Sequence, residues 1–363
     1  MQSSQNPLGL LGIDHLEFTA DSLASPTKDL FYELGFSKTF ETDGRQLFTQ
    51  GQIRFLLNAG PIGPHRDYFQ KHGEGVSKIS FLVQDTRHAL ETAVKRGGEA
   101  LGDLETTESE HGVYRTALIK GFGDVVNEFV ERPNRAPFRP DMKDLTQGLE
   151  GQDHPGRDHP FPRPLPTRVS RIDHLTNNVP KGEMEHWAHF YQKVYGFVET
   201  RYFDIKGQKT GLQSKVMQLV DNSIIIPINE PDEARGKSQI QEFLDEHRGS
   251  GVQHIALMSP DIISTVGELT ERGIPFLDVP DTYYEQLPNR PFTFTEERAT
   301  LNRLRLLADG DSEGYLLQIF TKPLIGPLFF EFIQRKNNWG FGEGNFQALF
   351  EAIERDQMKR GQL

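Results

Sequence analysis

The stretch IDHL occurs twice in this chain, at Ile13–Leu16 within LLGIDHLEFT and at Ile172–Leu175 within VSRIDHLTNN. After each copy, the sequence predicts the end of a helix, a glycine that terminates it (Gly35 or Gly196) and then a further strand. The two copies begin 159 residues apart. The repeat indicates that the chain consists of two related halves, each opened by a strand that carries a histidine.

A second pair of similar stretches extends the repeat. GEGVSKISFLVQDTRHALETAVKRGG resembles GSGVQHIALMSPDIISTVGELTERGI at an offset of 176 residues. Both patterns predict a strand and then an amphipathic helix, over 86–96 and 261–272. The apolar faces of the two helices are expected at Leu90, Ala93 and Val94 and at Ile262, Val266 and Leu269. Because the offset grows by about 17, we expect the extra residues of the second half in two polar loops, 204–215 and 229–241.

Further strands follow each predicted helix, among them QIRFLLNA, RLRLLAD and GYLLQIFT. The repeating unit is therefore βαβββ, and it occurs four times, starting near residues 12, 75, 171 and 251. The sequence predicts an α+β protein with two curved, mostly antiparallel, open barrel-like sheets, each made of two units. The expected segments are an N-terminal domain (1–131), a Pro- and Gly-rich linker (132–168), a C-terminal domain (169–342) and a terminal helix (343–363).

The composition narrows the chemistry that this protein can perform. None of the 363 residues is cysteine, which excludes thiol nucleophiles, disulfides and thiolate zinc sites. A net charge of −12 argues against nucleic acid as a partner. We expect no membrane span, because no apolar run reaches roughly 18 residues, and a cytoplasmic location, because no secretory signal is visible. Histidines and carboxylates are left to carry the chemistry.

Three residues are candidates for a metal site. His174 and His254 lie at matching places on the opening strands of the two units of the second half, on faces expected to point inward. Glu331 lies in the apolar strand PLFFEFIQRKN, where an unpaired buried carboxylate would cost several kcal/mol. Two histidines and one carboxylate form the facial triad that suits non-haem Fe(II). The alternatives are ordinary core histidines and a glutamate at a sheet edge with its head in water.

The other histidines carry a weaker signal. His186 and His189 have the H-x-x-H spacing of two ligands on one helix face, but their aromatic neighbours favour a packed amphipathic helix. In the first half, Lys78 stands where His254 stands in the second, and a protonated lysine cannot bind a metal ion. We therefore expect His15 to be structural and the first half to lack a complete metal site, with Glu128 as a candidate counterpart of Glu331.

The chain resembles a known family. The repeated unit resembles the vicinal oxygen chelate superfamily, and the second half with its tail resembles 4-hydroxyphenylpyruvate dioxygenases. The segments that match, over about 190 residues and in the family's order, are IDHLTNNV, GLQSKV, PINEP, KSQIQEFL, GSGVQHIAL, GYLLQIFTKP, FFEFIQRKN and WGFGEGNFQALFEAIE. The first half resembles the family's N-terminal domain. The resemblance implies two vicinal-oxygen-chelate domains and a C-terminal helix that covers the site.

The resemblance also implies roles for single residues. His174, His254 and Glu331 would hold Fe(II), and Gln239 and Gln318 would be catalytic polar groups near the substrate. The implied substrate-binding residues are Ser214, Asn229, Phe329, Phe341 and Phe346. Gln253 is left out, because strict strand alternation would turn it away from the face of its neighbour His254.

The activity that the resemblance implies is the Fe(II)-dependent conversion of 4-hydroxyphenylpyruvate and O2 to homogentisate and CO2, in tyrosine and phenylalanine catabolism. The family also implies a homodimer or homotetramer. Three alternatives remain open: a hydroxymandelate synthase that oxidises the benzylic carbon of the same substrate, an extradiol ring-cleaving dioxygenase, and a metal-free small-molecule-binding protein of the same superfamily. The bulk of Phe346 favours attack on the ring.

Overall fold

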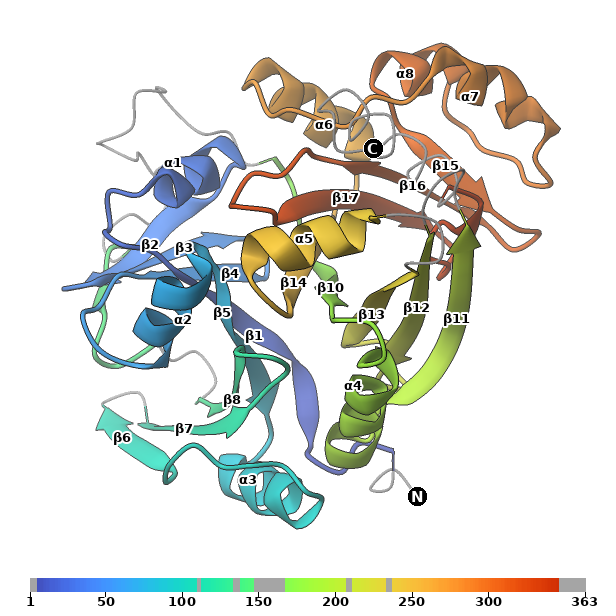
Figure 1. Ribbon diagram of the computed structural model, residues 1–363. Coiled ribbons are helices and arrows are strands. Elements are labelled where there is room, and N and C mark those ends of the chain that lie inside the picture. The colour runs from blue at the N-terminus through green and yellow to red at the C-terminus, as the bar shows by residue number, and fades with distance from the viewer. Residues whose placement is uncertain are drawn as a thin grey trace.

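Two curved sheets, one in each half of the chain, form the framework of the protein (Figure 1). The computed structural model describes residues 5–109, 112–132, 138–146, 167–206, 211–232 and 237–345. Each sheet contains two βαβββ units, as the repeat predicts. The half coloured blue to cyan in Figure 1 holds the first sheet, and the half coloured green to red holds the second.

The first sheet has nine strands in the order β6-β7-β8-β5-β1-β4-β3-β2-β9. Its strands and helices are β1 (Leu10–Thr19), α1 (Pro26–Glu33), β2 (Ser37–Thr42), β3 (Arg45–Gln50), β4 (Ile53–Asn58), α2 (Pro64–His72), β5 (Gly75–Val83), α3 (Thr86–Lys95), β6 (Glu105–Ser109), β7 (Gly112–Lys120), β8 (Val126–Glu131) and β9 (Lys143–Asp144). The short β9 lies in the segment that the sequence predicts as linker. It pairs with β2, and the nearby Phe138 and Met142 pack on Leu47 and Leu56.

The second sheet has eight strands in the order β11-β12-β13-β10-β14-β17-β16-β15. Its elements are β10 (Arg171–Asn178), α4 (Met184–Phe190), the π-helical turn η2 (Tyr191–Tyr195), β11 (Val198–Lys206), β12 (Gly211–Gln218), β13 (Ile225–Asp232), α5 (Gln239–His247), β14 (Gly251–Met258), α6 (Ile262–Glu271), α7 (Asp281–Gln286), the 3-10 turn η4 (Leu287–Asn289), α8 (Arg298–Arg303), β15 (Leu307–Gly310), β16 (Tyr315–Phe320) and β17 (Phe329–Lys336).

The same pairing rule builds both sheets. The opening strands of the two units in a half lie antiparallel at the centre, as β1 with β5 and as β10 with β14. Each opening strand also pairs in parallel with the last strand of its own unit, as β1 with β4 and as β14 with β17. The remaining pairs are antiparallel. The predicted fold class is thus confirmed, and the two histidine-bearing IDHL strands lie at equivalent central positions.

The two predicted unit helices form, but one buried face differs from the prediction. Asp85 and Asp261 cap α3 and α6, because each side chain accepts a hydrogen bond from the backbone N–H three residues on, that of His88 or Ser264. In α6 the predicted apolar residues are all buried. In α3 the buried face is instead centred on Ala89 and Ala93, and Val94 is 45% exposed. Val94 lies about 100° around the helix from Ala93, which turns it toward solvent.

In the two stretches predicted as extra loops, the described residues are mostly regular structure, which corrects the expectation for them, while 207–210 and 233–236 lie outside the described residues. Residues 204–215 contain the ends of the paired strands β11 and β12. Residues 229–241 end in the first turn of α5, where Ser238 accepts a hydrogen bond from the N–H of Gln241. Serine followed by glutamine three residues later is a capping-box pattern, and it was the sequence signal for this helix. The predicted terminal helix, 343–363, falls mainly outside the described residues.

One continuous hydrophobic core extends across both halves. Phe55 of the first sheet lies 6.3 Å from Phe330 of the second, and Phe81 lies 5.5 Å from Tyr195, measured between ring centroids. Gly35 ends the first helix with a φ of +89°, and a side chain there would collide with Thr167, just before the second sheet. The halves are therefore fixed against each other by packing. Among the described residues, no helix is long and apolar enough to cross a bilayer.

A stacked pair of histidines joins α2 to α5 at the boundary between the halves. The ring centroids of His72 and His247 lie 4.3 Å apart with an angle of 18° between the planes, and Phe243 also stacks on His247, at 5.1 Å. The Tyr68 hydroxyl donates to Nε2 of His247 over 2.8 Å, and Nδ1 of His247 donates to the Gly249 carbonyl. Burial and the neighbouring His72 lower the pKa of His247 to about 4.

We predict that acidic pH lowers the stability of the folded protein through protonation of His247. In an unfolded chain His247 has a pKa near 6.5, so the unfolded state takes up the proton first as the pH falls. The free energy of unfolding should therefore drop between about pH 6.5 and pH 4, by up to about 3 kcal/mol from this group. Urea unfolding at pH 7.0, 5.5 and 4.5 measures the loss. His247→Gln should show a shallower pH dependence, and an unchanged slope would contradict the assignment.

Candidate metal centre

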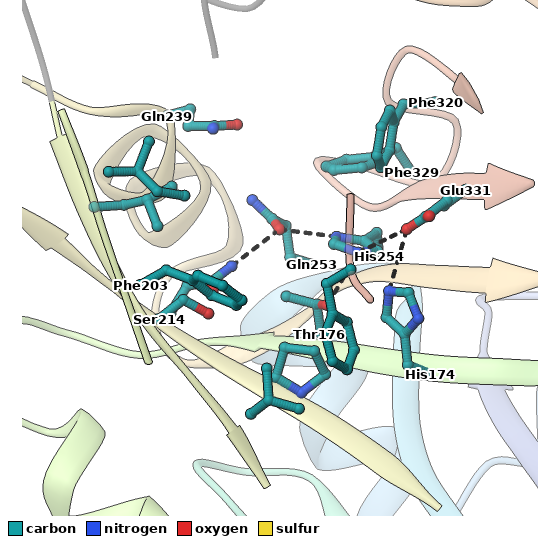
Figure 2. Close-up of a pocket in the computed structure, with 16 residues that line it drawn as sticks. His174, Thr176, Phe203, Ser214, Gln239, Gln253, His254, Phe320, Phe329 and Glu331 are labelled. Carbon is teal, nitrogen blue, oxygen red and sulfur yellow. Dashed lines mark hydrogen bonds and ion pairs between the residues drawn. The ribbon is translucent and has the colours of Figure 1, made fainter. Parts of the chain in front are cut away.

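The three predicted ligands meet on the inner face of the second sheet (Figure 2). His174, His254 and Glu331 each offer one ligand atom, and these atoms lie within 4.8 Å of one another. Oε2 of Glu331 is 3.1 Å from Nε2 of His174 and 3.5 Å from Nε2 of His254. All three residues are buried or nearly so. Among the described residues, this is the one group of His and acidic side chains with such a geometry.

The register of three neighbouring strands produces this convergence. His174 on β10 pairs with Ala256 on β14, and Ala256 pairs with Glu331 on β17. Because Ala256 has only a methyl group, the imidazole and the carboxylate can meet over it. His254 lies two residues away on β14, which returns its side chain to the same face. Three ligands from three strands thus surround one point without any loop in between.

Two β-bulges, one on β10 and one on β14, each give one of the two histidines a hydrogen-bond acceptor. The pairing of β10 with β14 skips Asp173 on one strand and Gln253 on the other. A bulged residue departs from strict alternation, so its side chain can lie beside that of its neighbour. Asp173 Oδ2 accepts from Nδ1 of His174, and Gln253 Oε1 accepts from Nδ1 of His254, both over 2.9 Å.

These acceptors fix the tautomers of the two imidazoles. With Nδ1 carrying the proton, Nε2 is the atom of each ring that can bind a metal ion, and in both rings it faces Glu331. Nε2 of His254 also lies 2.9 Å from the Thr176 hydroxyl, which a metal ion would have to displace. The expectation that Gln253 points away from the site is therefore wrong. The sequence signal was available, because both ligand histidines follow a residue with a side-chain acceptor, in DH and in QH.

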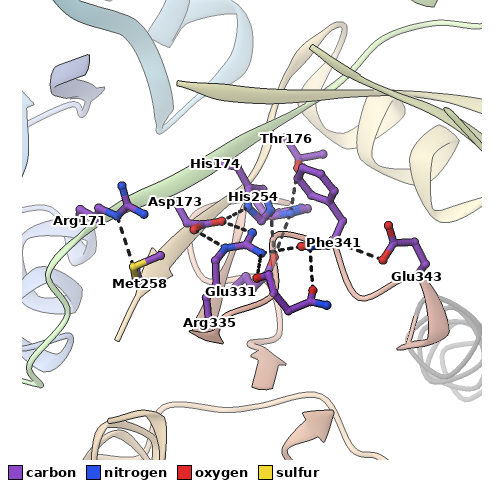
Figure 3. Close-up of polar contacts among 12 residues, drawn as sticks. Arg171, Asp173, His174, Thr176, His254, Met258, Glu331, Arg335, Phe341 and Glu343 are labelled. Carbon is purple, nitrogen blue, oxygen red and sulfur yellow. Dashed lines mark hydrogen bonds and ion pairs between the residues drawn. The ribbon is translucent and has the colours of Figure 1, made fainter. Parts of the chain in front are cut away.

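Arg335 supports the pair of Asp173 and His174 by binding the Asp173 carboxylate (Figure 3). Its Nε and Nη2 donate to the two carboxylate oxygens of Asp173 over 2.8 and 2.7 Å. Its Nη1 donates to the carbonyls of Asn338 and Gly340, in the segment that leads to Phe341. The guanidinium is almost fully buried. Arg335 therefore anchors both the histidine partner and the chain that covers the cavity.

The electrostatics of the site favour a bound cation. Arg335 holds the pKa of Asp173 well below its usual range despite burial, which acts in the opposite direction. Among the described residues, the ion-pair partners of Glu331 are the two histidines. Burial lowers the pKa of His174, but Glu331 and the bond to Asp173 outweigh it and raise this pKa to about 9. Burial lowers the pKa of His254. A divalent cation would compensate Glu331 in place of that proton.

The donor set fits a first-row divalent metal ion. Two imidazole nitrogens and one carboxylate suit Fe, Mn, Co, Ni or Zn, and three ligands on one side leave coordination positions toward the cavity. The H-x-x-H pair offers no competing site, because His186 and His189 are both exposed and belong to no such group. A metal cofactor at His174, His254 and Glu331 is thus consistent with the structure.

An aromatic cavity adjoins the three ligands (Figure 2). Its lining includes the ligands and Thr176, Phe203, Ile205, Leu212, Ser214, Val216, Pro227, Asn229, Gln239, Gln253, Phe320, Phe329 and Phe341. Phe329 stacks on His254 at 4.9 Å, and Phe341 meets His174 edge-on at 5.8 Å. In Figure 2 the metal ligands lie at one side of the cavity and Ser214 and Gln239 at the other, with Gln253 between. Five expected substrate or catalytic residues, Ser214, Asn229, Gln239, Phe329 and Phe341, line this one cavity.

Of the two remaining expected residues, Gln318 is absent from the residues that line this cavity. Gln318 lies two residues before Phe320 on β16, fully buried, and neither atom of its amide has a hydrogen-bond partner among the described residues. Gly342 packs against this amide so closely that a Cβ there would overlap it. Buried polar groups are normally paired, so this amide has a hydrogen-bonding capacity that the described residues leave unused. Phe346 lies outside the described residues.

We predict that Asp173→Asn weakens metal binding. An asparagine keeps the shape but loses the charge that orients and polarises His174, and changes in such supporting residues typically reduce metal affinity by about 10- to 100-fold. Titration of the metal-free protein with Co(II) measures the affinity. The matched control is Asp14→Asn, which changes the corresponding aspartate of the first IDHL and should leave the affinity unchanged. Equal affinities in both variants and the unchanged protein would contradict this role.

Comparisons with known proteins agree with the fold and the site. Residues 4–142 match the family described as hydroxyphenylpyruvate dioxygenase, N-terminal, and residues 171–287 match the glyoxalase/bleomycin resistance protein/dioxygenase superfamily. The protein MelA of Shewanella colwelliana is 41% identical, with both chains covered completely. A 4-hydroxyphenylpyruvate dioxygenase of Legionella pneumophila is 40% identical over 99% of this chain and 98% of that protein.

A solved structure gives the same result in three dimensions. A mutant of 4-hydroxymandelate synthase from Streptomyces coelicolor superposes with a TM-score of 0.81 at 27% identity, over 96% of this chain and 99% of that one. Both halves are thus vicinal-oxygen-chelate domains. With full-length identity of about 40% to curated relatives, this chain belongs to the 4-hydroxyphenylpyruvate dioxygenase family.

Proposed function

We propose that this protein converts 4-hydroxyphenylpyruvate and O2 to homogentisate and CO2, a step of tyrosine and phenylalanine catabolism. The observation that carries the proposal is the meeting of His174, His254 and Glu331 on one face, beside a cavity lined with aromatic side chains. The curated relatives named as 4-hydroxyphenylpyruvate dioxygenases support it over the whole length of the chain.

We further propose Fe(II) as the metal and the facial triad as its ligand set. When bound, Fe(II) supplies open positions for the 2-oxo acid group of the substrate and for O2, together with the redox chemistry that joins them. The charges support this arrangement. Glu331 offsets one of the two positive charges of the ion, and the carboxylate of the substrate offsets the other, so the buried site is neutral only with substrate in place.

The protein's own residues position the substrate. We propose that the carboxamides of Gln239, Gln253 and Asn229 and the Ser214 hydroxyl surround the phenol end, since amides both donate and accept hydrogen bonds. Asn229 Nδ2 already lies 3.5 Å from Gln253 Oε1, so two of these polar groups are linked to each other. Phe329 and Phe341 pack against the ring, and such aromatic pairs contribute about 0.5–1.5 kcal/mol beyond burial. The apolar lining also keeps water away from the oxidising metal.

The second candidate is a 4-hydroxymandelate synthase, which would oxidise the benzylic carbon of the same substrate. The superposition on a mutant of that enzyme favours it as the alternative. The relatives at about 40% identity favour the dioxygenase. The expected discriminating residue, Phe346, lies outside the described residues, so the product decides between the two.

We also propose that the protein acts as a homodimer or homotetramer in the cytoplasm. The family resemblance supports the oligomer, and light scattering coupled to size exclusion would measure it. A chain without cysteine and a site for a metal that must stay reduced both suit a reducing compartment.

We predict that the Fe(II) protein consumes O2 with 4-hydroxyphenylpyruvate and releases equal amounts of homogentisate and CO2. An oxygen electrode with product identification by chromatography and mass measures this. Glu331→Gln keeps the size of the side chain but removes its charge, so bound metal should fall from one equivalent to nearly none and activity with it. If hydroxymandelate were the product, the reaction would be reassigned and the metal site retained. Full activity of Glu331→Gln would refute the site.

We predict that Gln318→Leu damages catalysis without damaging the fold. Loss of a hydrogen bond to substrate should reduce kcat/KM at least roughly tenfold. The melting temperature should stay equal or rise, because leucine replaces a buried amide without partners. Thr116→Val is the matched control, since Thr116 lies at the corresponding register position of the first sheet. A lower melting temperature with unchanged kcat/KM would make Gln318 a structural residue.

A further inference from the structure

The first half keeps a modified copy of the metal centre. His15 on β1 pairs with Ser80 on β5, and Ser80 pairs with Glu128 on β8. This row has the same register as His174, Ala256 and Glu331 in the second half. The strand pairing therefore places Glu128 at the position of Glu331. It also preserves the bulge, because the pairing of β1 with β5 skips Asp14, whose carboxylate accepts from Nδ1 of His15 over 2.9 Å.

Lys78 occupies the position of the missing histidine. It pairs with Glu17 in the register in which His254 pairs with Thr176. Its Nζ lies 3.0 Å from Oε2 of Glu17 and 3.3 Å from Oε2 of Glu128. Nε2 of His15 lies 3.5 Å from that same oxygen of Glu128. The ammonium thus reaches the carboxylate oxygen that also faces the histidine.

We propose that the Lys78 ammonium is the permanent cation of the first half, in the place that the metal ion takes in the second, so that this half is a closed metal site. Its consequence is that the chain binds one divalent ion and not two. Because the ammonium is part of the chain, it compensates the buried carboxylates Glu17 and Glu128 without any bound metal ion.

Charge compensation supports the proposal. Each buried carboxylate of the first half has a cation within reach: Asp14 has Arg132 at 2.8 Å, Glu17 has Lys78, and Glu128 has both Lys78 and Arg139. Although burial raises the pKa of Glu128, Lys78 and Arg139 lower it to about 2. In the second half Asp173 has Arg335, but Glu331 has only the histidines among the described residues.

Ser80 also occupies space between His15 and Glu128 in the first half. Its hydroxyl donates to Oε2 of Glu128 over 2.6 Å and lies 3.0 Å from Nε2 of His15. In the second half the methyl group of Ala256 leaves that space open. Three differences lie at the position of the ion: Glu17 in place of threonine, Lys78 in place of histidine and Ser80 in place of alanine. A fourth lies at the bulge beside it, where Ser77 stands in place of Gln253.

The proposal is tested by reopening the site in the full-length chain. The triple variant Glu17→Thr, Lys78→His, Ser80→Ala copies the second half at these positions. Metal-free protein is titrated with Co(II), and bound metal is measured by elemental analysis after dialysis and by the absorption of the bound ion. We expect one equivalent per chain in the unchanged protein and two in the variant. Adding His15→Ala to the variant should return it to one.

A folded triple variant that binds a single equivalent would overturn the proposal, as would a second equivalent that persists with His15→Ala. Circular dichroism establishes folding, and the activity of the intact second half provides an independent check. Two equivalents in the unchanged protein would overturn it as well, because the first half would then be open.

A second measurement keeps the proposal testable if the triple variant does not fold. Lys78→Met leaves the buried Glu17 without its cation and Glu128 with Arg139 alone, and it should lower the melting temperature. Glu128→Gln should lower the melting temperature of the unchanged protein but raise that of Lys78→Met, because it removes one of the two neighbouring buried negative charges that shared the lost ammonium. Such a reversal of sign is expected only if Lys78 acts as the counter-charge of Glu128. If Glu128→Gln lowers both melting temperatures equally, Lys78 is not the resident cation.

Discussion

The antiparallel pairing of two opening strands is the constraint on which the rest of this structure depends. Where β10 lies against β14, and β14 in turn lies parallel to β17, the register alone brings His174 and Glu331 to either side of Ala256. Backbone hydrogen bonds therefore set the spacing of the ligands, and no loop has to fold correctly to create the site. A site supported in this way is rigid before any metal or substrate arrives.

The bulges refine what the register provides. Without them, Asp173 and Gln253 would point to the opposite face, and the two imidazoles would have no acceptor for Nδ1. Arg335 then links this support to the chain near Phe341, so one buried guanidinium serves both the histidine partner and the covering segment. The site is thus a set of linked hydrogen bonds in which the three ligands are only the innermost members.

The two halves show how one fold can solve the same electrostatic problem twice. Both place a histidine, its aspartate and a glutamate at the centre of a curved sheet. A buried glutamate beside a histidine needs a compensating positive charge. Lys78 stands where it can supply that charge in the first half, and in the second half the same position holds His254, which leaves room for an ion. The common core across both sheets holds the halves together whichever cation is used.

The sequence by itself determined the duplication and the βαβββ unit, and it singled out the three candidate ligands that the structure brings together. These follow from repeated strand patterns, and from the cost of placing Glu331 among phenylalanines. The capping pattern of Ser238 and Gln241 is also a local signal, and it predicts the start of α5. Only the tertiary structure decided that Gln253 faces the site, that Val94 faces solvent and that Arg335 supports His174. The physical reason is that bulges, the rotation of a helix against its sheet and long-range ion pairs depend on which strand lies beside which. A period of two or of 3.6 residues carries no information about that choice.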